Sequence, residues 1–128
     1  MTTKQKITEV IAISPAGTWV DMSGYRQFAA LATLAAADDG EGVSVQLRKA
    51  TSAAGANADD HGSLVTVTSA ATDTDLSAMA SAYAADLGET AGGVRFTHVT
   101  AVVSRTGSPA STEELSGIVV RCDGRFSE

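Results

Sequence analysis

Apolar and polar residues alternate along several stretches of the chain, and this alternation predicts β-strands. The clearest case is residues 43–48, where three aliphatic residues alternate with three polar ones in VSVQLR. A strand with one face in a core and the other in solvent has this period of two. A shorter alternation marks residues 63–68, and residues 117–122 predict the last strand.

Other apolar stretches also predict strands. The first covers residues 7–13 and ends at the turn-type sequence SPAG, and a short second segment begins at Trp19. Residues 25–36 are ambiguous, because the spacing of Phe28, Leu31 and Leu34 suits one face of a helix. A continuous apolar run that ends at DDGEG also suits a strand buried on both sides, and we interpret it as a strand.

Polar linkers separate these stretches. Residues 38–42, DDGEG, predict a hairpin loop before the strand at 43–48. Residues 50–62 are small and polar without a period and predict an exposed loop, and residues 70–75 form a second polar connection.

The segment 75–87 allows two interpretations. Its larger residues recur at helical spacing behind an Asp or Thr that could cap a helix, which makes it the best helix candidate in the chain. The same residues could form a strand that presents Met79, Ser81 and Tyr83 on one face. Both interpretations stay open on the sequence alone.

The fold class follows from the number and spacing of the strands. Residues 94–104 have apolar side chains on both faces and predict a long strand in the centre of a sheet. Six to eight short strands with polar turns predict an all-β protein, a single β-sandwich or jelly-roll-like domain over residues 15–128. Residues 1–14 predict an extended N-terminal segment, either an arm that reaches a neighbour or an edge strand.

Composition adds that the core must be thin. The chain has 128 residues, of which 44% are hydrophobic but only 5% aromatic, so Val, Ile, Leu and Ala must fill the core. A domain of this size buries only about two-thirds of the surface of its unfolded chain. We therefore expect it to gain stability by binding other copies or partners.

Charge and cysteine content narrow the function. The net charge is −6 and the basic residues are scattered, which argues against nucleic acid as a partner. Cys122 is the only cysteine, so neither an internal disulfide nor a cysteine-based metal cluster can form. The sequence has no apolar run of the roughly 20 residues that a membrane span needs.

Candidate chemistry is sparse, and we expect no enzyme activity, cofactor or metal. His61, beside Asp59 and Asp60, and His98, within a predicted strand, are the two residues that could act as a general base, and neither lies in a recognisable motif. The acidic pairs 59–60 and 73–75 lack the pattern of a calcium loop. Solvated loop carboxylates and structural histidines explain these residues.

The layout of the chain resembles a known family. The sequence SPAGTWVDMSGY, the phrase VQLRKATSAAG and the later ETAGGVRFTHVTAVVS follow one another as in small structural proteins from the head gene clusters of tailed bacteriophages. The resemblance covers most of the chain and is weakest at residues 77–80. It implies a decoration or cement protein, a β-sandwich that coats the capsid, is made in the host cytoplasm and belongs to the virion surface.

The resemblance also implies partners, namely the major capsid protein and further copies in a dimer or trimer. A virion protein of this kind would use apolar anchors at its interfaces. The candidate interface residues are Ile7, Val10, Ile11, Ile13, Trp19 and Tyr25. For Trp19 and Tyr25, packing in the protein's own core is an equal alternative to a role at an interface. The rival functions are a tail or head-fibre component, a carbohydrate-binding adhesion module, and a small hydrolase that uses one of the histidines.

Overall fold

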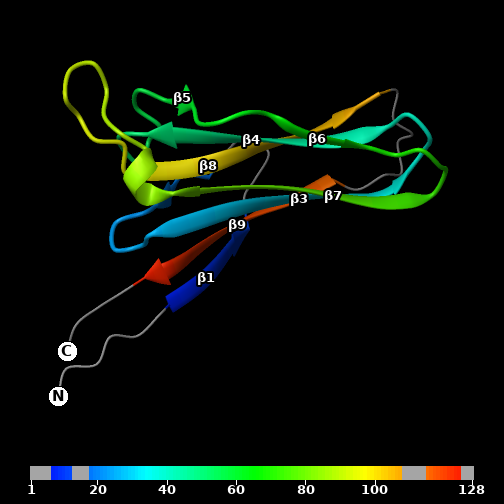
Figure 1. The fold of residues 1–128 in the computed structure, drawn as a ribbon, viewed down its shortest axis with the longest axis horizontal. Helices are drawn as coiled ribbons and strands as arrows, with labels where there is room; N and C mark the ends of the chain where they lie inside the picture. The colour runs from blue at the N-terminus through cyan, green and yellow to red at the C-terminus, as the bar shows by residue number, and fades with distance from the viewer. Residues whose placement is uncertain (1–6, 13–17, 108–114, 125–128) are drawn as a thin grey trace.

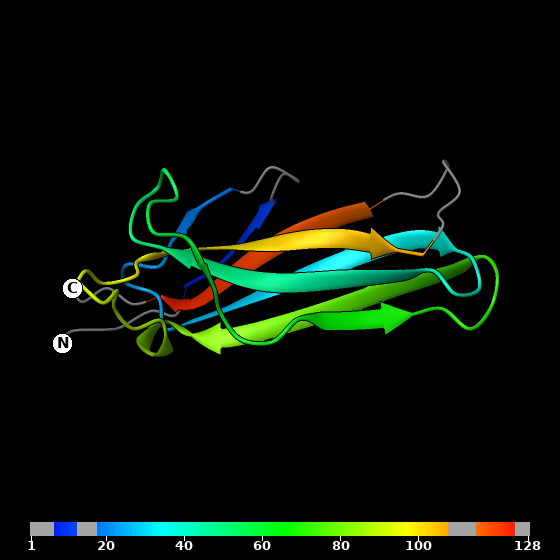
Figure 2. The same ribbon diagram turned by 90° about the horizontal axis from the view of Figure 1, so that it is seen from above.

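The computed structural model describes residues 7–12, 18–107 and 115–124, which form two antiparallel β-sheets packed face to face (Figures 1 and 2). One sheet has four strands in the order β1-β9-β3-β7, and the other has the order β2-β8-β4-β5, with β6 also paired to β4. The elements are β1 (Ile7–Ala12), β2 (Val20–Asp21), β3 (Gln27–Ala37), β4 (Gly42–Ala50), β5 (Asp59–Asp60), β6 (Val65–Thr68), β7 (Thr74–Tyr83), the short 3-10 helix η1 (Ala84–Asp86), β8 (His98–Thr106) and β9 (Leu115–Gly124).

The strand order is that of a jelly roll. β5 and β6 both pair with β4 and together take the place of one interrupted strand. The first four strands then alternate between the two sheets, as do the last three, so most connections cross the sandwich. This arrangement confirms the predicted all-β fold class and its jelly-roll-like form.

The predicted hairpin at residues 38–42 is wrong. β3 belongs to the four-stranded sheet and β4 to the other, so this connection crosses between sheets. The backbone of Glu41 donates to Asp38 and accepts from Ser69, at 3.0 and 2.7 Å, which fastens the crossing to the chain that follows β6. Gly42 comes next, where an added Cβ would lie 2.6 Å from Thr106 Oγ1 and 2.7 Å from Val67 O. Glycine is needed there because β6 and β8 both approach closely.

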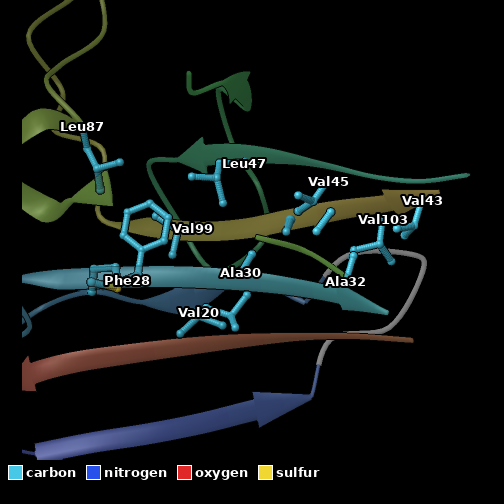
Figure 3. Packing of buried hydrophobic residues seen from close by; sticks show 14 of the residues in the cluster. Val20, Phe28, Ala30, Ala32, Val43, Val45, Leu47, Leu87, Val99 and Val103 are labelled. Carbon is cyan, nitrogen blue, oxygen red and sulfur yellow. The ribbon is translucent and has the colours of Figure 1, made fainter. Parts of the chain in front are cut away.

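The core lies between the inner faces of the two sheets (Figure 3). β3 supplies its even-numbered residues from Phe28 to Leu34, each at most 1% exposed. They meet Val43, Val45 and Leu47 of β4 and alternate residues of β8. Segment 25–36, which also fitted a helix, is therefore a strand whose odd-numbered residues are half-buried or exposed on the other face, not a strand buried on both sides.

A β-bulge near the end of β3 shifts this alternation by one residue. Leu34 pairs with Leu76 of β7, but Ala37 pairs with Thr74, so β3 holds one residue more than β7. Ala36 takes the left-handed conformation at φ 55°, and its N–H donates to the Asp75 carboxylate at 3.0 Å. The shift turns Ala37 into the core, where it is fully buried.

Segment 75–87 is the strand β7 followed by η1, so the strand interpretation holds over most of its length and the helix interpretation is wrong. β7 pairs with β3 from Thr74 to Tyr83. Its helical spacing was coincidental, because Leu76 and Ala80 face the core whereas Met79 and Tyr83 are exposed. Pairing with β3 therefore decides the conformation of this alanine-rich segment.

The strand at 94–104 and the loop at 50–62 both differ in extent from the predictions. The long strand predicted at 94–104 begins only at His98, because residues 88–97 form a loop closed by the bridge between Glu89 and Arg95. The predicted strand is nevertheless internal, since β8 lies between β2 and β4. The exposed loop predicted at 50–62 contains the short strand β5, which pairs with Arg48 and Lys49.

Replacement of Phe28, the largest fully buried side chain, tests how much the thin core depends on one aromatic ring. We expect Phe28→Ala to lower the free energy of unfolding by about 3–5 kcal/mol, because few large neighbours can refill the cavity. Urea denaturation measures the change. Leu64→Ala, at a residue 58% exposed, is the control and should change stability by less than about 0.5 kcal/mol. Equal losses in both variants would contradict this description of the core.

Candidate interaction surface

The outer face of the four-stranded sheet is the surface most unlike an ordinary solvent-facing sheet. We define this outer face by the outward residues of the regularly paired stretch, residues 27–33 of β3, 77–83 of β7 and 116–118 of β9. The register places them side by side. They are Gln27, Ala29, Leu31, Thr33, Ser77, Met79, Ser81, Tyr83, Ser116 and Ile118. Asp75 of β7 is exposed and charged, but it lies beyond this stretch, at the bulge.

No residue of this outer face is charged, although the chain carries a net charge of −6. Met79 is 63% exposed and Tyr83 is 56% exposed, while Leu31 and Ile118 are half-buried beside them. Thr33 Oγ1 and Ser116 Oγ form a hydrogen bond of 2.5 Å across two strands. These two hydroxyl groups satisfy each other, and the exposed apolar side chains remain open to contact.

Trp19 and Tyr25, the predicted aromatic anchors, both have partners within the chain. An added Cβ on Gly55 would lie 2.5 Å from Trp19 Nε1, so the indole rests against the loop between β4 and β5. Gly55 has φ 81° and provides both the close approach and the turn. The Tyr25 ring packs on the core, with the Arg121 guanidinium 4.3 Å from its centroid.

Arg121 also ties β9 to β2 at this end of the sandwich. Its Nη1 donates to the carbonyl of Asp21. The N–H of Ser23 donates to the Asp21 carboxylate at 2.8 Å, and this hydrogen bond lowers the pKa of Asp21. Tyr25 therefore has contacts within its own chain, with the core and with Arg121.

The apolar N-terminal residues that the sequence predicted as an interface fall on β1. Ile7, Val10 and Ile11 lie in β1, whose backbone pairs antiparallel with β9 of the same chain. Ile13 lies outside the described residues. Residues 7–12 therefore pair within their own sheet, while the arm or edge-strand role of residues 1–14 as a whole stays a prediction.

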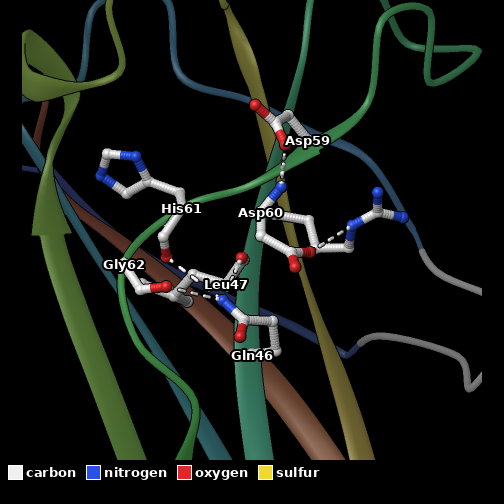
Figure 4. Close-up of polar contacts among 7 residues, drawn as sticks. Gln46, Leu47, Asp59, Asp60, His61 and Gly62 are labelled. Atoms are coloured by element: carbon white, nitrogen blue, oxygen red, sulfur yellow. Dashed lines mark hydrogen bonds and ion pairs between the residues drawn. The ribbon is translucent and has the colours of Figure 1, made fainter.

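His61 lies in a hydrogen-bonded polar cluster at the end of β5 (Figure 4). Its N–H donates to Leu47 O at 2.9 Å, and Gln46 Nε2 donates to the carbonyls of His61 and Gly62 at 3.5 and 3.1 Å. The neighbouring Asp60 carboxylate accepts from Arg48 Nε at 3.1 Å. Desolvation by burial lowers the pKa of His61 below its usual range, with a smaller contribution from Lys49.

The remaining candidates for chemistry are dispersed. His98 is the first residue of β8, and its Nδ1 lies 2.8 Å from Oγ1 of the preceding Thr97, while His61 lies beyond β5. Within the described ranges, no group of three His, Cys, Asp or Glu residues could hold a metal ion. No helix among those residues is long and apolar enough to cross a membrane.

A cleft of about 590 Å³ opens at the end of the sandwich beside η1. Its lining includes Tyr25, Tyr83, Phe96 and Arg95. Lys49 Nζ lies 4.6 Å from the centroid of the Phe96 ring and donates to Leu87 O at 2.9 Å. Cations therefore already lie over two of these three rings.

The sequence predicted part of this surface but missed its extent. The strand interpretation of 75–87 placed Met79, Ser81 and Tyr83 on one face, and all three are exposed there. The sequence did not predict that β3 contributes to this surface, because in the sequence the half-buried Leu31 cannot be told from a core residue. The signal that could have found the surface is the absence of charge between Asp75 and Asp86.

No family model matches the sequence, and no curated protein matches it. Among solved structures, one of the Gx strain of infectious bursal disease virus covers 99% of the chain at 7% identity and a TM-score of 0.41. A VP2 subviral particle of that virus covers 96% at 10% identity and 0.39. A chain from the disulfide-linked pili of Bacillus endospore appendages covers 94% of this chain and 86% of its own length, at 13% identity and 0.28.

The chain spans only 29% and 33% of the two viral chains. Similarity at these identities and TM-scores carries no inference about function.

The environment of His61 predicts a pH dependence. Its pKa is lowered in the folded state from the usual 6.5, so the unfolded chain binds a proton more readily. The free energy of unfolding should therefore fall as the pH drops below about 6.5. We expect His61→Gln to reduce this fall when denaturation is measured between pH 7 and 5. Parallel profiles for the two proteins would show that His61 does not contribute.

Proposed function

We propose that the chain is a non-enzymatic virion protein that decorates and stabilises an icosahedral phage capsid by binding the major capsid protein and other copies of itself. The observation that carries this proposal is the uncharged outer face of the four-stranded sheet, with Met79 and Tyr83 exposed on it. The sequence resemblance to decoration proteins indicates that the assembly is a phage capsid.

The physical argument concerns what such a face does in water. An antiparallel sheet with one solvated face ordinarily places polar residues outward. An acidic protein has ample charge to place there, yet none of the residues that define the outer face is charged, and Asp75 of β7 lies beyond them at the bulge. Exposed apolar residues in an uncharged surface are typical of a contact with another protein. This supports a role in assembly.

The absence of convergent chemistry in the described residues agrees with a structural role. His61 donates its backbone N–H to β4 and does not contact His98 or a serine nucleophile in any described contact. The Asp60 carboxylate is engaged by Arg48, not by the imidazole of His61. The arrangement needed for a hydrolase, a base hydrogen-bonded to a nucleophile and to an orienting acid, is not built from these residues.

The jelly roll itself does not decide between the proposed role and a carbohydrate-binding module, because capsid and lectin domains share it. The cleft at η1 favours the second function, since it contains aromatic and arginine side chains. Sugar rings stack on open aromatic faces, however, and cations lie over Tyr25 and Phe96. The cleft therefore supports carbohydrate binding less well than the outer face supports assembly.

The interface role of β1 remains part of the proposal. Among the described strands, β1 is the outermost in its sheet and pairs with β9 along one edge. Ile7, Val10 and Ile11 are proposed to contact the capsid or a neighbouring copy from this position, and Ile13, outside the described residues, is proposed to contribute to the same interface. Exchange of such a terminal strand between copies is an established route to assembly.

Cryo-electron microscopy of particles from the virus that encodes the chain tests the proposed function. We expect a two-layered density on the outer surface of the capsid that fits the jelly roll, with the outer face toward the capsid or a neighbouring copy. Density for the chain in the tail would favour the rival role, and absence from purified particles by mass spectrometry would contradict the proposal.

Deletion of the first 14 residues separates folding from attachment. Because β1 pairs with β9 through five registered residue pairs, we expect the variant that starts at Pro15 to melt at a lower temperature. Binding to particles stripped of the protein should fall as well, when measured below that melting temperature. A strongly lowered melting temperature with unchanged binding would contradict the interface role of the segment.

A further inference from the structure

The edges of the two sheets are protected to very different degrees. β2 and β5 have two residues each and β6 has four, so these strands offer little backbone to another chain. β1 has a register shift between Ile7 and Glu9 and a carboxylate at Glu9. Short strands, irregular pairing and charge are the usual means of preventing edge-to-edge association.

β7 has none of these protections along most of its length. It has ten residues and, in the described part of the chain, pairs only with β3. Residues 76–83, LSAMASAY, contain no charge, proline or glycine. The pairing with β3 is regular from Gln27 to Leu34, and the bulge lies beyond it. A long, regular and uncharged edge is a template for another strand.

The register shows which backbone groups this edge presents. The N–H of Ala84 donates to Arg26 O at 2.8 Å, so the even-numbered residues of β7 direct their N–H and C=O groups toward β3. The odd-numbered residues then direct theirs to the free edge. These are Ser77, Met79, Ser81 and Tyr83, whose side chains are all exposed on the outer face.

We propose that β7 is a self-association site, at which two copies pair their β7 strands antiparallel about a two-fold axis at Ala80. Ser77 of each copy then lies opposite Tyr83 of the other, and Met79 lies opposite Ser81. The two four-stranded sheets become one continuous sheet. This inference specifies the self-association in the proposed function, and it can fail while capsid binding stands.

A second copy is the occupant that the residues favour. An antiparallel two-fold contact needs a strand that complements itself, and here each large outward residue meets a small one in the other copy. The paired stretch contains no charge, so two chains of net charge −6 meet where neither contributes repulsion. Asp75 and Asp86 fall outside it.

The adjacent register is less suitable. If the axis passed through Met79, the two Met79 side chains would oppose each other and Asp75 would lie opposite Tyr83. Asp75 already accepts a hydrogen bond from Ala36 at the bulge, where the strand bends. Pairing about Ala80 uses the regular part of the strand and leaves this carboxylate in place.

Charge substitution tests the edge. We expect Met79→Lys to weaken self-association at least roughly tenfold in sedimentation equilibrium, because it places an ammonium group beside the paired strand. Val102→Lys is the matched control, since Val102 is an exposed strand residue, 43% accessible, on the other sheet. It should associate like the wild type, and circular dichroism checks that both variants fold. Equal association of both variants would overturn the proposal, as would a wild type that stays monomeric.

Disulfide trapping tests the register, in a Cys122→Ser background. Residues in a hydrogen-bonded antiparallel pair have Cα atoms about 5.5 Å apart, within the range that a disulfide spans. The double variant Ser77→Cys/Tyr83→Cys should form a covalent dimer on oxidation. The control Ser77→Cys/Ser81→Cys should not, and dimers from the control alone would overturn the register.

The N-terminal segment of another copy is the competing occupant of the edge. The variant that starts at Pro15 distinguishes the two, because it retains β7. We expect it to self-associate and to keep its sensitivity to Met79→Lys. Loss of association in a variant that still folds would overturn pairing between β7 strands. Particle binding, measured separately, tests the proposed function whatever the outcome here.

Discussion

The packing of β3 between its two neighbours and the opposite sheet is the contact on which the rest of the structure depends. β3 pairs with both β7 and β9, and its inward residues meet β4 and β8 across the sandwich. Ala30 and Ala32 are fully buried in this contact, and Ala78 and Ala101 lie nearby at 2% exposure. Small side chains make the core thin, so few large residues hold the two sheets together.

The crossing connections follow from this central contact. Because β3 must lie in one sheet and β4 in the other, the chain turns between layers at residues 38–41, and hydrogen bonds to Ser69 hold that turn. Within the described part of the chain, the same topology places β7 at the outside of its sheet, paired with β3 along one edge. The features proposed for assembly, the uncharged outer face and the free edge, thus arise from the strand order that builds the core.

The sequence predicted the fold class because alternation is strong where one face is buried, as at residues 43–48. It did not predict which strands pair. The acidic glycine-rich linker 38–42 looks the same whether it joins neighbours in one sheet or crosses to another, since both need a tight turn. Segment 75–87 is rich in alanine, and only the long-range partner β3 selects a strand there.

The candidate surface was harder to predict for a related reason. An exposed Met79 is visible as apolar in the sequence, but its exposure depends on which face of β7 packs against the core. For Trp19 the sequence suggested an interface that the structure does not require. A lone tryptophan suggests an anchor for a partner, whereas Gly55 of its own chain lies against it. Local patterns indicate strands, and tertiary pairing decides which side of each strand is free.

The contact between Trp19 and Gly55 has a spectroscopic consequence. Trp19 is the single tryptophan, and it lies half-buried on the loop between β4 and β5, apart from the buried core cluster. Its indole fluorescence therefore reports the docking of that loop, while the far-ultraviolet circular dichroism of the strands reports the sandwich. The protein has a built-in optical label with which opening of one loop can be followed separately from global unfolding.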